Sequence, residues 1–304
     1  MRVAVCVATF ARRDGLRRLL QSLRGLVLDE EATVAKVVVV DNDPAGSARP
    51  VVDAVGDLPW PLDYVVEPTR GISAARNRAV LQAGPVDFVA FIDDDEWAEP
   101  TWLAELLRTQ ARTQAQVVVG PVVPAFEESP PPSWFTKGGF LAPYRYEQDE
   151  QLGFAYTGNV LVQSSVLEPA GAPFSERFGL LGGEDTHFFM RVQLSGAKIV
   201  WAAEALVHES VPAARMTASW LVRREYRRGN TLSLCLRDLE DSPQRRFKRV
   251  AHGLLRIGQG TAYTGAAILF GRRMLVRGLQ RIAFGAGLIT GLGAHTYRAY
   301  GGDR

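Results

Sequence analysis

Four consecutive acidic residues after an apolar stretch give the clearest sign of chemistry in this sequence: Asp93, Asp94, Asp95 and Glu96. Such a cluster is costly unless a cation compensates it. In an extended chain Asp93 and Asp95 point to one side and Asp94 to the other, so the first two can converge on one ion. Hard oxygen ligands favour Mg²⁺ or Mn²⁺, and few protein ligands leave positions open for phosphate oxygens. The structural alternative is an acidic turn that caps the helix after Pro100.

A second pair of carboxylates, Glu184 and Asp185, follows two glycines, Gly182 and Gly183. The glycines let a ligand approach the backbone and leave the carboxylates at the mouth of a cleft. A placed carboxylate that removes a proton typically accelerates a reaction about 10²- to 10⁴-fold. An acidic helix start stabilised by the helix dipole would give the same pattern.

Apolar strands and amphipathic helices alternate along the first half of the chain and must position these groups. The expected strands cover residues 3–8, 37–40, 64–66 and 86–92, with helical spacing of leucines in 16–26 and a helix from about Ser73. This alternation predicts an α/β fold with a mostly parallel sheet, which binds ligands at the carboxyl ends of its strands. Asp41, Asn42 and the acidic cluster all fall at such ends.

Beyond residue 123 the alternation gives way to a loop rich in proline and aromatic residues. This loop is either a lid on the acceptor side or a surface excursion held by its own aromatic side chains. Glu184 to Leu194 is expected to form a helix, and the pattern after Ala213 is helical and basic.

Composition describes a globular chain of 304 residues, 47% hydrophobic and 22% charged. Residues 1–211 hold 18 basic and 28 acidic residues, and the rest hold 17 and 5, which gives net charges of −10 and +12. The basic part is expected to meet phosphates or a membrane surface, or else to be a solvated helical face. Its uncharged stretches, 257–271 and 282–297, fall short of the ~20 residues of a spanning helix. No secretory signal is visible, which favours a cytoplasmic protein at the inner membrane face.

These segments, in this order, resemble glycosyltransferase family 2, whose members have the GT-A fold, and the resemblance covers about residues 2–211. In that family the acidic triplet is the DxD motif that binds the divalent metal and the ribose and diphosphate of the donor. The match implies that Asp93 and Asp94 contact the donor, and that Asp93, Asp95 and His208 hold Mn²⁺ or Mg²⁺. A lone histidine such as His208 is more often a packed or capping residue.

The resemblance also implies a set of donor contacts near the nucleotide. The opening strand, the second strand end and the Arg-Gly-x-x-x-Ala-Arg-Asn segment supply them: Ala8, Thr9, Phe10, Asp41, Asn42, Arg70, Gly71, Arg76 and Asn77. The family often has Asp-Asp-Gly-Ser where this chain has Asp41-Asn42-Asp43-Pro44. That departure leaves open which residue reads the base and which nucleotide is bound.

By the same match Asp185 is the general base, with Glu184 beside it, and the anomeric centre is inverted. The residues expected to contact sugar or acceptor are Gly158, Asn159, Gly183, His187, Arg223 and Arg227. Guanidinium groups suit diphosphates, so the two arginines fit a lipid-diphosphate acceptor. For His187 a place on the helix surface is the competing interpretation.

The sequence therefore predicts a GT-A domain over residues 1–211, Rossmann-like with helices on both faces of the sheet, and a basic helical extension over 212–304. The predicted activity is inverting, metal-dependent hexosyl transfer from a nucleotide-sugar, best a UDP-sugar, to a glycan or polyprenyl-diphosphate-linked acceptor. Peripheral membrane contact and no nucleic-acid partner are expected. One alternative is a sugar-phosphate nucleotidylyltransferase, although its glycine-rich phosphate loop is missing. The other is an inactive glycan- or membrane-binding protein.

Overall fold

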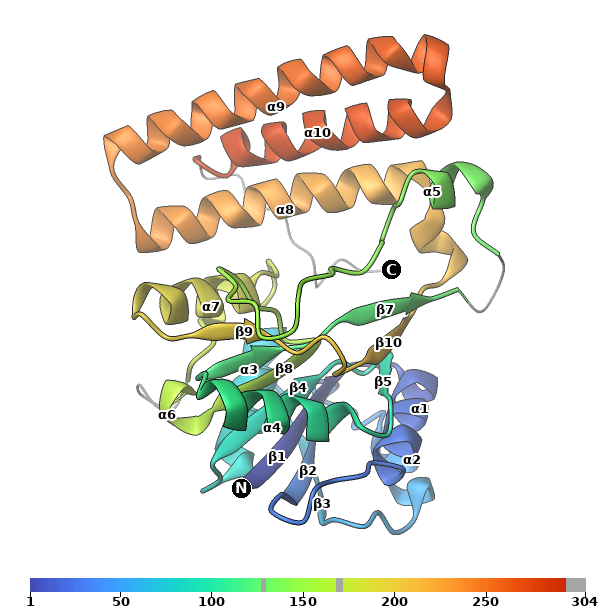
Figure 1. Ribbon diagram of the computed structural model, residues 1–304, viewed down its shortest axis with the longest axis vertical. Helices are drawn as coiled ribbons and strands as arrows, with labels where there is room; N and C mark the ends of the chain where they lie inside the picture. The colour runs from blue at the N-terminus through green and yellow to red at the C-terminus, as the bar shows by residue number, and fades with distance from the viewer. Residues whose placement is uncertain (127–129, 168–171, 294–304) are drawn as a thin grey trace. The chain divides into compact units, whose positions relative to one another are not determined.

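The computed structural model describes residues 1–126, 130–167 and 172–293 (Figure 1). The chain forms two compact units. The sheet unit comprises Met1–Ala125, Pro143–Gly179 and Glu184–Ser210, and the helical unit comprises Phe126–Ala142, Leu180–Gly183 and the chain from Val211. The division into two domains at residue 211 stays a prediction. The helical unit also includes two segments that precede this residue in the chain.

A seven-stranded sheet forms the centre of the sheet unit, in the order β3-β2-β1-β4-β8-β6-β9. All neighbouring strands are parallel except β8, which is antiparallel to β4 and β6. The strands are β1 (Arg2–Thr9), β2 (Thr33–Asp41), β3 (Leu62–Val66), β4 (Phe88–Ile92), β6 (Val117–Val119), β8 (Asn159–Gln163) and β9 (Ile199–Trp201). The predicted mostly parallel α/β sheet is confirmed.

Both faces of the sheet are buried, because its strands alternate between two apolar clusters. In β1, Val3, Val5 and Val7 belong to one cluster, and Ala4 and Cys6 to the other. The first cluster includes side chains from α1 (Arg13–Arg24), α2 (Arg49–Val55) and α4 (Trp102–Thr113). The second includes side chains from α3 (Ile72–Ala83), α6 (Ser164–Leu167) and α7 (Glu184–Leu194). Helices therefore cover both faces, as the sequence predicted.

A small second sheet, in the order β5-β10-β7, lies in the same unit. It consists of β5 (Glu96–Ala98), β7 (Val122–Ala125) and β10 (Val207–Ser210). Because β4 ends at Ile92 and β5 begins at Glu96, the three aspartates between them form the turn that joins the two sheets. We call residues 93–96 the acidic turn.

Three long helices dominate the helical unit: α8 (Ala218–Leu239), α9 (Pro243–Phe270) and α10 (Arg272–Thr290). Figure 1 shows α9 and α10 as an antiparallel hairpin. The short helix α5 (Ser133–Lys137) contributes Phe135 to a cluster with Phe140, Met216, Leu221 and Val276. Part of the proline-rich loop is thus held by its own aromatic side chains. A helical C-terminal part is present, as expected.

Glycines bring the backbones of these helices into direct contact. A Cβ atom built on Gly285 would lie 2.4 Å from the carbonyl oxygen of Gly253, and one on Gly278 would lie 2.8 Å from that of Gly260. A Cβ on Gly287 would lie 2.2 Å from the oxygen of Tyr226 on α8. Only glycine fits at such distances.

Within residues 1–126, 130–167 and 172–293, no helix has the length and apolar character needed to cross a membrane.

Candidate active site

Asp94 points back from the acidic turn towards the first strand. The hydroxyl of Thr9 donates a 2.8 Å hydrogen bond to Asp94 Oδ2, and Arg12 Nη1 lies 2.8 Å from Asp94 Oδ1. The same guanidinium lies 3.1 Å from Asp95 Oδ2. Burial raises the pKa of Asp94 to about 6, although Arg12 opposes this shift. Arg12 was not among the predicted site residues, and its place just after an apolar strand was the available signal.

Glu96 stabilises the acidic turn from the interior of the protein. It is buried, and its Oε2 accepts a 2.9 Å hydrogen bond from the backbone N–H of Asp93. Burial raises its pKa well above the ordinary value. A Cβ on Gly158 would lie 2.5 Å from Glu96 Oε1, so this glycine makes room for a carboxylate of the protein. A contact of Gly158 with sugar stays a prediction. Glu96 is not among the predicted site residues, although it completes the acidic run.

Arg76 joins the acidic turn to the start of α7. Its Nη2 lies 2.9 Å from Asp93 Oδ1, and its Nη1 contacts Glu184 Oε1. Arg76 is 6% exposed and Glu184 is 4% exposed. Burial raises the pKa of Glu184, while Arg76 lowers it. Within the described part of the chain, Glu184 Oε2 has no hydrogen-bond partner. One buried cation therefore connects the two carboxylate pairs found in the sequence.

Asp185 follows Glu184 in the first turn of α7 and is less deeply buried than its neighbour. Its Oδ1 accepts a 3.2 Å hydrogen bond from the hydroxyl of Thr186. Glu184 is bound to Arg76, and Asp185 is the more exposed carboxylate of this pair. Its role as general base stays a prediction.

Asp41 and Asn42 shape the loops at the end of β2. Asp41 is fully buried, and its Oδ2 accepts hydrogen bonds from the Ala48 N–H at 2.7 Å and the Tyr64 hydroxyl at 2.8 Å. Asn42 Oδ1 accepts a 2.9 Å hydrogen bond from the Gly71 N–H. The Asn42 amide also donates to the carbonyls of residues 67 and 69. Both side chains thus form hydrogen bonds within the protein. Their predicted contact with the base stays a prediction.

Phe10 and Arg70 form the outward-facing part of the predicted donor set. The Phe10 side chain is 42% exposed, and the guanidinium carbon of Arg70 lies 4.4 Å from its ring centroid. Ala8 is half-buried on the same strand. Gly71 has φ +135°, and a Cβ there would lie 3.1 Å from the backbone of Gly179. Of these predicted residues, the structure brings Arg70 and Phe10 together.

Asn77 and Ser73, both on α3, form hydrogen bonds to residues 174–175, which precede α7. The Asn77 amide donates a 2.8 Å hydrogen bond to the Phe174 carbonyl, and its Oδ1 accepts one of 2.9 Å from the Phe174 N–H. One turn earlier, the Ser73 hydroxyl donates a 2.9 Å hydrogen bond to the Ser175 carbonyl. In this structure Asn77 is a structural residue, and a donor contact stays a prediction.

Two residues expected to contact sugar are instead packed in the core. Asn159 is fully buried: it accepts a 2.7 Å hydrogen bond from Trp102 Nε1 and donates to the Pro121 and Ala205 carbonyls. His187 is 3% exposed, and its ring lies 4.7 Å from that of Phe178. Both side chains are buried in this structure, and a contact of either with sugar or acceptor stays a prediction.

His208 lies on β10, opposite Trp97 of β5. Its Nε2 is 2.7 Å from Glu99 Oε1, and its ring stacks on Trp97 at 5.3 Å. Over the residues that the structure describes, no three His, Cys, Asp or Glu side chains form a group that could hold a metal ion. Asp93 and Asp95 thus share the acidic turn without His208, whose role as a ligand stays a prediction.

The other expected acceptor contacts belong to the helical unit. Gly183 has φ +91°, and a Cβ there would lie 1.9 Å from Thr231 Cγ2 of α8, so packing alone requires glycine. Arg223 and Arg227 lie four residues apart and share a face of α8. Their contact with an acceptor stays a prediction.

The family model for glycosyl transferase family 2 matches residues 4–169, more than half of the chain. The chain therefore belongs to glycosyltransferase family 2. It is 35% identical over 232 residues to the succinoglycan biosynthesis protein ExoM of Rhizobium meliloti, a match that covers 76% of this chain and 74% of ExoM.

Solved structures of glycosyltransferases share the GT-A fold seen here. The mannosyltransferase PcManGT from Pyrobaculum calidifontis, in complex with GDP-Man and Mn²⁺, matches with a TM-score of 0.66 at 17% identity, covering 95% of this chain and 86% of PcManGT. TarS of S. aureus, in complex with UDP, matches with a TM-score of 0.53 at 16% identity, covering 94% of this chain and 90% of the TarS chain.

Proposed function

We propose that this glycosyltransferase is metal-dependent and inverting, and that it moves a hexose from a UDP-sugar to a glycan or polyprenyl-diphosphate-linked acceptor in polysaccharide biosynthesis. One observation carries the proposal: buried Arg76 ties Asp93 to Glu184, next to Asp185. A transferase needs a donor-binding acid group and a base close together. The UDP, GDP-Man and Mn²⁺ in the named structures support the donor and metal classes, and the name of ExoM supports the pathway class.

The acidic turn fits a divalent cation. Thr9 and Arg12 hold Asp94. The Asp93 and Asp95 side chains, which contact Arg76 and Arg12, are 39% and 19% exposed. Two accessible carboxylates are hard oxygen donors of the kind that Mg²⁺ and Mn²⁺ prefer. When bound, such an ion would neutralise negative charge on the departing diphosphate. Asp93 and Asp95 would hold it.

Asp185 is the residue that handles the proton in the proposed reaction. The acceptor hydroxyl oxygen forms a bond to the anomeric carbon while the bond from that carbon to the diphosphate oxygen breaks. Asp185 takes the hydroxyl proton, and the nucleoside diphosphate leaves with the bonding electrons. Because attack and departure occur on opposite faces of the sugar, a single displacement inverts the anomeric centre. Arg76 holds Glu184 and thereby keeps the start of α7 beside the acidic turn.

The acceptor side is proposed to include Arg223 and Arg227, whose guanidinium groups suit a diphosphate. A polyprenyl-diphosphate acceptor is membrane-bound, so we place the enzyme peripherally at the cytoplasmic membrane face. Contact through the C-terminal helices fits their basic composition. Membership of the family gives no support to the nucleotidylyltransferase alternative.

The test is donor binding and donor hydrolysis with and without Mn²⁺. Thermal shift is measured with UDP, GDP and a panel of their sugars, because a ligand that binds only the native state raises the melting temperature. We expect a Mn²⁺-dependent shift with one nucleotide series and slow release of free sugar. The anomer formed is read by NMR on any acceptor that is found. No shift with any nucleotide would overturn the proposal.

Two variants make this experiment specific. Asp95→Asn removes a carboxylate of the acidic turn and should abolish the Mn²⁺ dependence of the shift. Asp14→Asn is the matched control, because its side chain is 95% exposed in the same unit and pairs only at the surface with Arg17. Binding without hydrolysis in the wild type would favour an inactive binding protein. A guanosine-specific shift would correct the proposed nucleotide.

A further inference from the structure

The outer face of α9 and the turn into α10 expose several large apolar side chains. At the turn, Ile268 is 90%, Leu269 82% and Phe270 56% exposed. Further back along α9, other large apolar side chains are 58% to 74% exposed: Phe247, Leu254 and Leu255. Large apolar side chains exposed in such numbers on one element mark an interaction surface. We call Ile268, Leu269 and Phe270 with Arg272 and Arg273 the hairpin tip.

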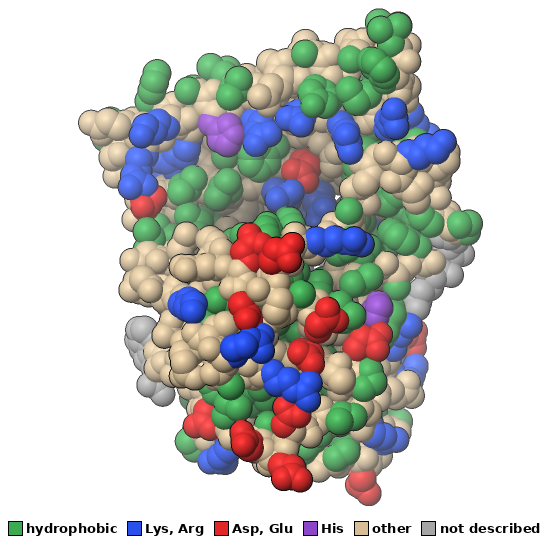
Figure 2. Space-filling view, viewed as in Figure 1, with side chains coloured by type: hydrophobic (Ala, Val, Ile, Leu, Met, Phe, Trp, Pro, Cys, Tyr) green, Lys and Arg blue, Asp and Glu red, His purple; other side chains and the backbone are tan. Residues whose placement is uncertain are grey.

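The charges of the hairpin all have one sign. Residues 243–290 contain no Asp or Glu, whereas they include Arg245, Arg246, Lys248, Arg249, Arg256, Arg272, Arg273, Arg277 and Arg281. In Figure 2, hydrophobic side chains gather over α9 and Lys and Arg side chains form a row beneath them. A helix with an apolar outer face, flanking arginines and no acidic residue has the pattern of a helix that lies in a lipid interface.

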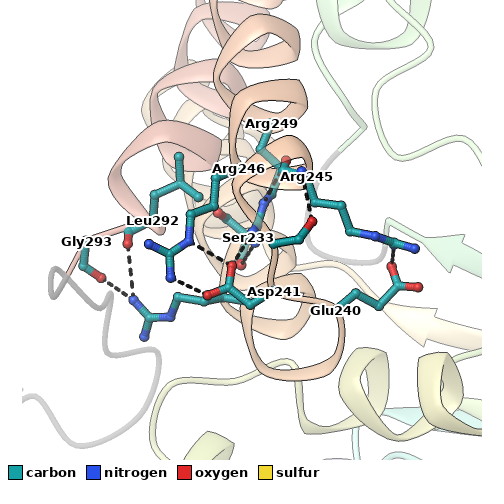
Figure 3. Close-up of polar contacts among 10 residues, drawn as sticks. Ser233, Glu240, Asp241, Arg245, Arg246, Arg249, Leu292 and Gly293 are labelled. Atoms are coloured by element: carbon teal, nitrogen blue, oxygen red, sulfur yellow. Dashed lines mark hydrogen bonds and ion pairs between the residues drawn. The ribbon is translucent and has the colours of Figure 1, made fainter.

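The two ends of the hairpin differ in how their charges are met. At the base, Asp241 accepts hydrogen bonds from Arg246 and Arg249, and Glu240 contacts Arg245 (Figure 3). At the tip, Arg272 lies over the ring of Trp134 at 4.5 Å, and among the residues that the structure describes neither Arg272 nor Arg273 forms an ion pair. Among the described residues, acidic side chains therefore pair with the arginines at the base and not with those at the tip.

We propose that the hairpin tip is the membrane anchor of this protein, which inserts Ile268, Leu269 and Phe270 among the acyl chains of an anionic bilayer while Arg272 and Arg273 meet lipid phosphates. This deepens the membrane contact of the proposed function and names its residues. A second copy of the chain is a poor occupant, because a symmetric contact would place arginines against arginines. Close glycine packing between α9 and α10 holds the tip as a preformed unit.

The experiment is flotation of the full chain with vesicles, compared between two double variants. The vesicles are equimolar phosphatidylcholine and phosphatidylglycerol, with pure phosphatidylcholine as the neutral reference. Ile268→Gln/Leu269→Gln should lower binding to the anionic vesicles roughly tenfold or more. The control Leu81→Gln/Leu194→Gln changes leucines that are 66% and 57% exposed on other helices and should bind like the wild type. Arg272→Gln/Arg273→Gln should weaken binding and reduce its dependence on salt.

Several outcomes would overturn the inference. They are failure of the wild type to float with anionic vesicles, equal binding by Ile268→Gln/Leu269→Gln, or equal loss in both leucine double variants. A wild-type dimer that Ile268→Gln/Leu269→Gln converts to monomer would show that the surface joins two copies instead. Donor hydrolysis is measured on the same samples without vesicles. Retained hydrolysis with no flotation would reject the anchor and leave the proposed transferase intact.

Discussion

The acidic turn and the helical hairpin treat charge in opposite ways. At the candidate active site two buried carboxylates have partners: Asp94 of the acidic turn has Thr9 and Arg12, and Glu184 at the start of α7 has Arg76. In the hairpin, basic side chains continue for two helices without an acidic residue among them. A buried charge must be compensated by a partner inside the protein, whereas an exposed charge is solvated and can bind an external ligand. The comparison separates charges that hold the fold from charges available to an external partner.

The largest effect is expected from Asp185, the more exposed of the two carboxylates at the start of α7. Asp185→Asn should reduce sugar transfer about 10²- to 10⁴-fold, because the acceptor proton loses its base. Thermal shift by the nucleotide with Mn²⁺ should stay unchanged. Steady-state transfer and thermal shift on the same sample check this. Asp14→Asn again serves as control, and an Asp185→Asn enzyme of normal rate would remove Asp185 from the mechanism.

Arg76→Met tests the buried pairing directly. It leaves Glu184 and Asp93 without this cation, and the loss of one partner of a buried ion pair costs about 3–5 kcal/mol of unfolding free energy. Burial already raises the pKa of Glu184, and loss of Arg76 should raise it further. A carboxyl whose pKa is higher folded than unfolded destabilises the fold as pH rises between those values. The deficit should therefore be larger at pH 8 than at pH 5, by urea denaturation.

The double variant Arg76→Met/Glu184→Leu sharpens the same point. Apolar replacement of both partners should recover part of the lost stability, because no buried charge is left unpaired by their contact. Transfer activity should not recover, since the start of α7 is no longer tied to Asp93. Recovery of activity together with stability would mean that Arg76 serves the fold alone.

In the hairpin, packing should matter more than charge. Gly260→Ala places a methyl group 2.6 Å from the carbonyl oxygen of Gly278 and should cost about 1–3 kcal/mol. Gly265→Ala, five residues along the same helix, meets nothing within 4 Å and should be neutral or stabilising by up to about 1 kcal/mol. Thermal denaturation followed by circular dichroism compares the two. Equal effects would refute backbone contact between α9 and α10.

The smallest effect is expected at the base of the hairpin. Hydrogen bonding from Arg246 lowers the pKa of Asp241 to about 2, so this carboxylate favours folding above its ordinary pKa and loses that effect as pH falls towards 2. Asp241→Asn should lower the melting temperature slightly at pH 7, and added salt should shrink the difference. Glu204→Gln, at an exposed site, is the control. A salt-independent loss would point to geometry instead of charge.

Sequence patterns were sufficient for the fold, because periodicity reports burial directly. The alternation of valines in β1 and the leucine spacing of α1 place both faces of the sheet. The acidic turn and the start of α7 were also found, since carboxylates at strand and helix ends are conspicuous. A sequence does not reveal which polar groups satisfy one another. Asn159 and His187 have polar side chains typical of ligand contacts, yet Asn159 bonds to Trp102, 57 residues away, and His187 stacks on Phe178.

Arg12 and Glu96 escaped prediction for the same reason. Arg12 follows an apolar strand and precedes another arginine, so its local context does not distinguish it from a surface residue. Only the parallel pairing of β1 with β4 places it beside Asp94 and Asp95. Glu96 differs from its acidic neighbours because β5 begins there and turns it inward. Long-range pairing decides both positions.

The glycine contacts of α9 and α10 also divide the hairpin into positions where the amino acid must be kept in evolution and positions where it can change. Positions 253, 260, 278 and 285 accept little beyond a hydrogen atom, so descendants of this sequence should keep them. The outward side chains at 268–270 touch little of the protein, and exchanges among leucine, isoleucine and phenylalanine there leave the frame intact. Lineages that meet membranes of different composition could therefore change the side chains of this surface without changing the packing of α9 against α10.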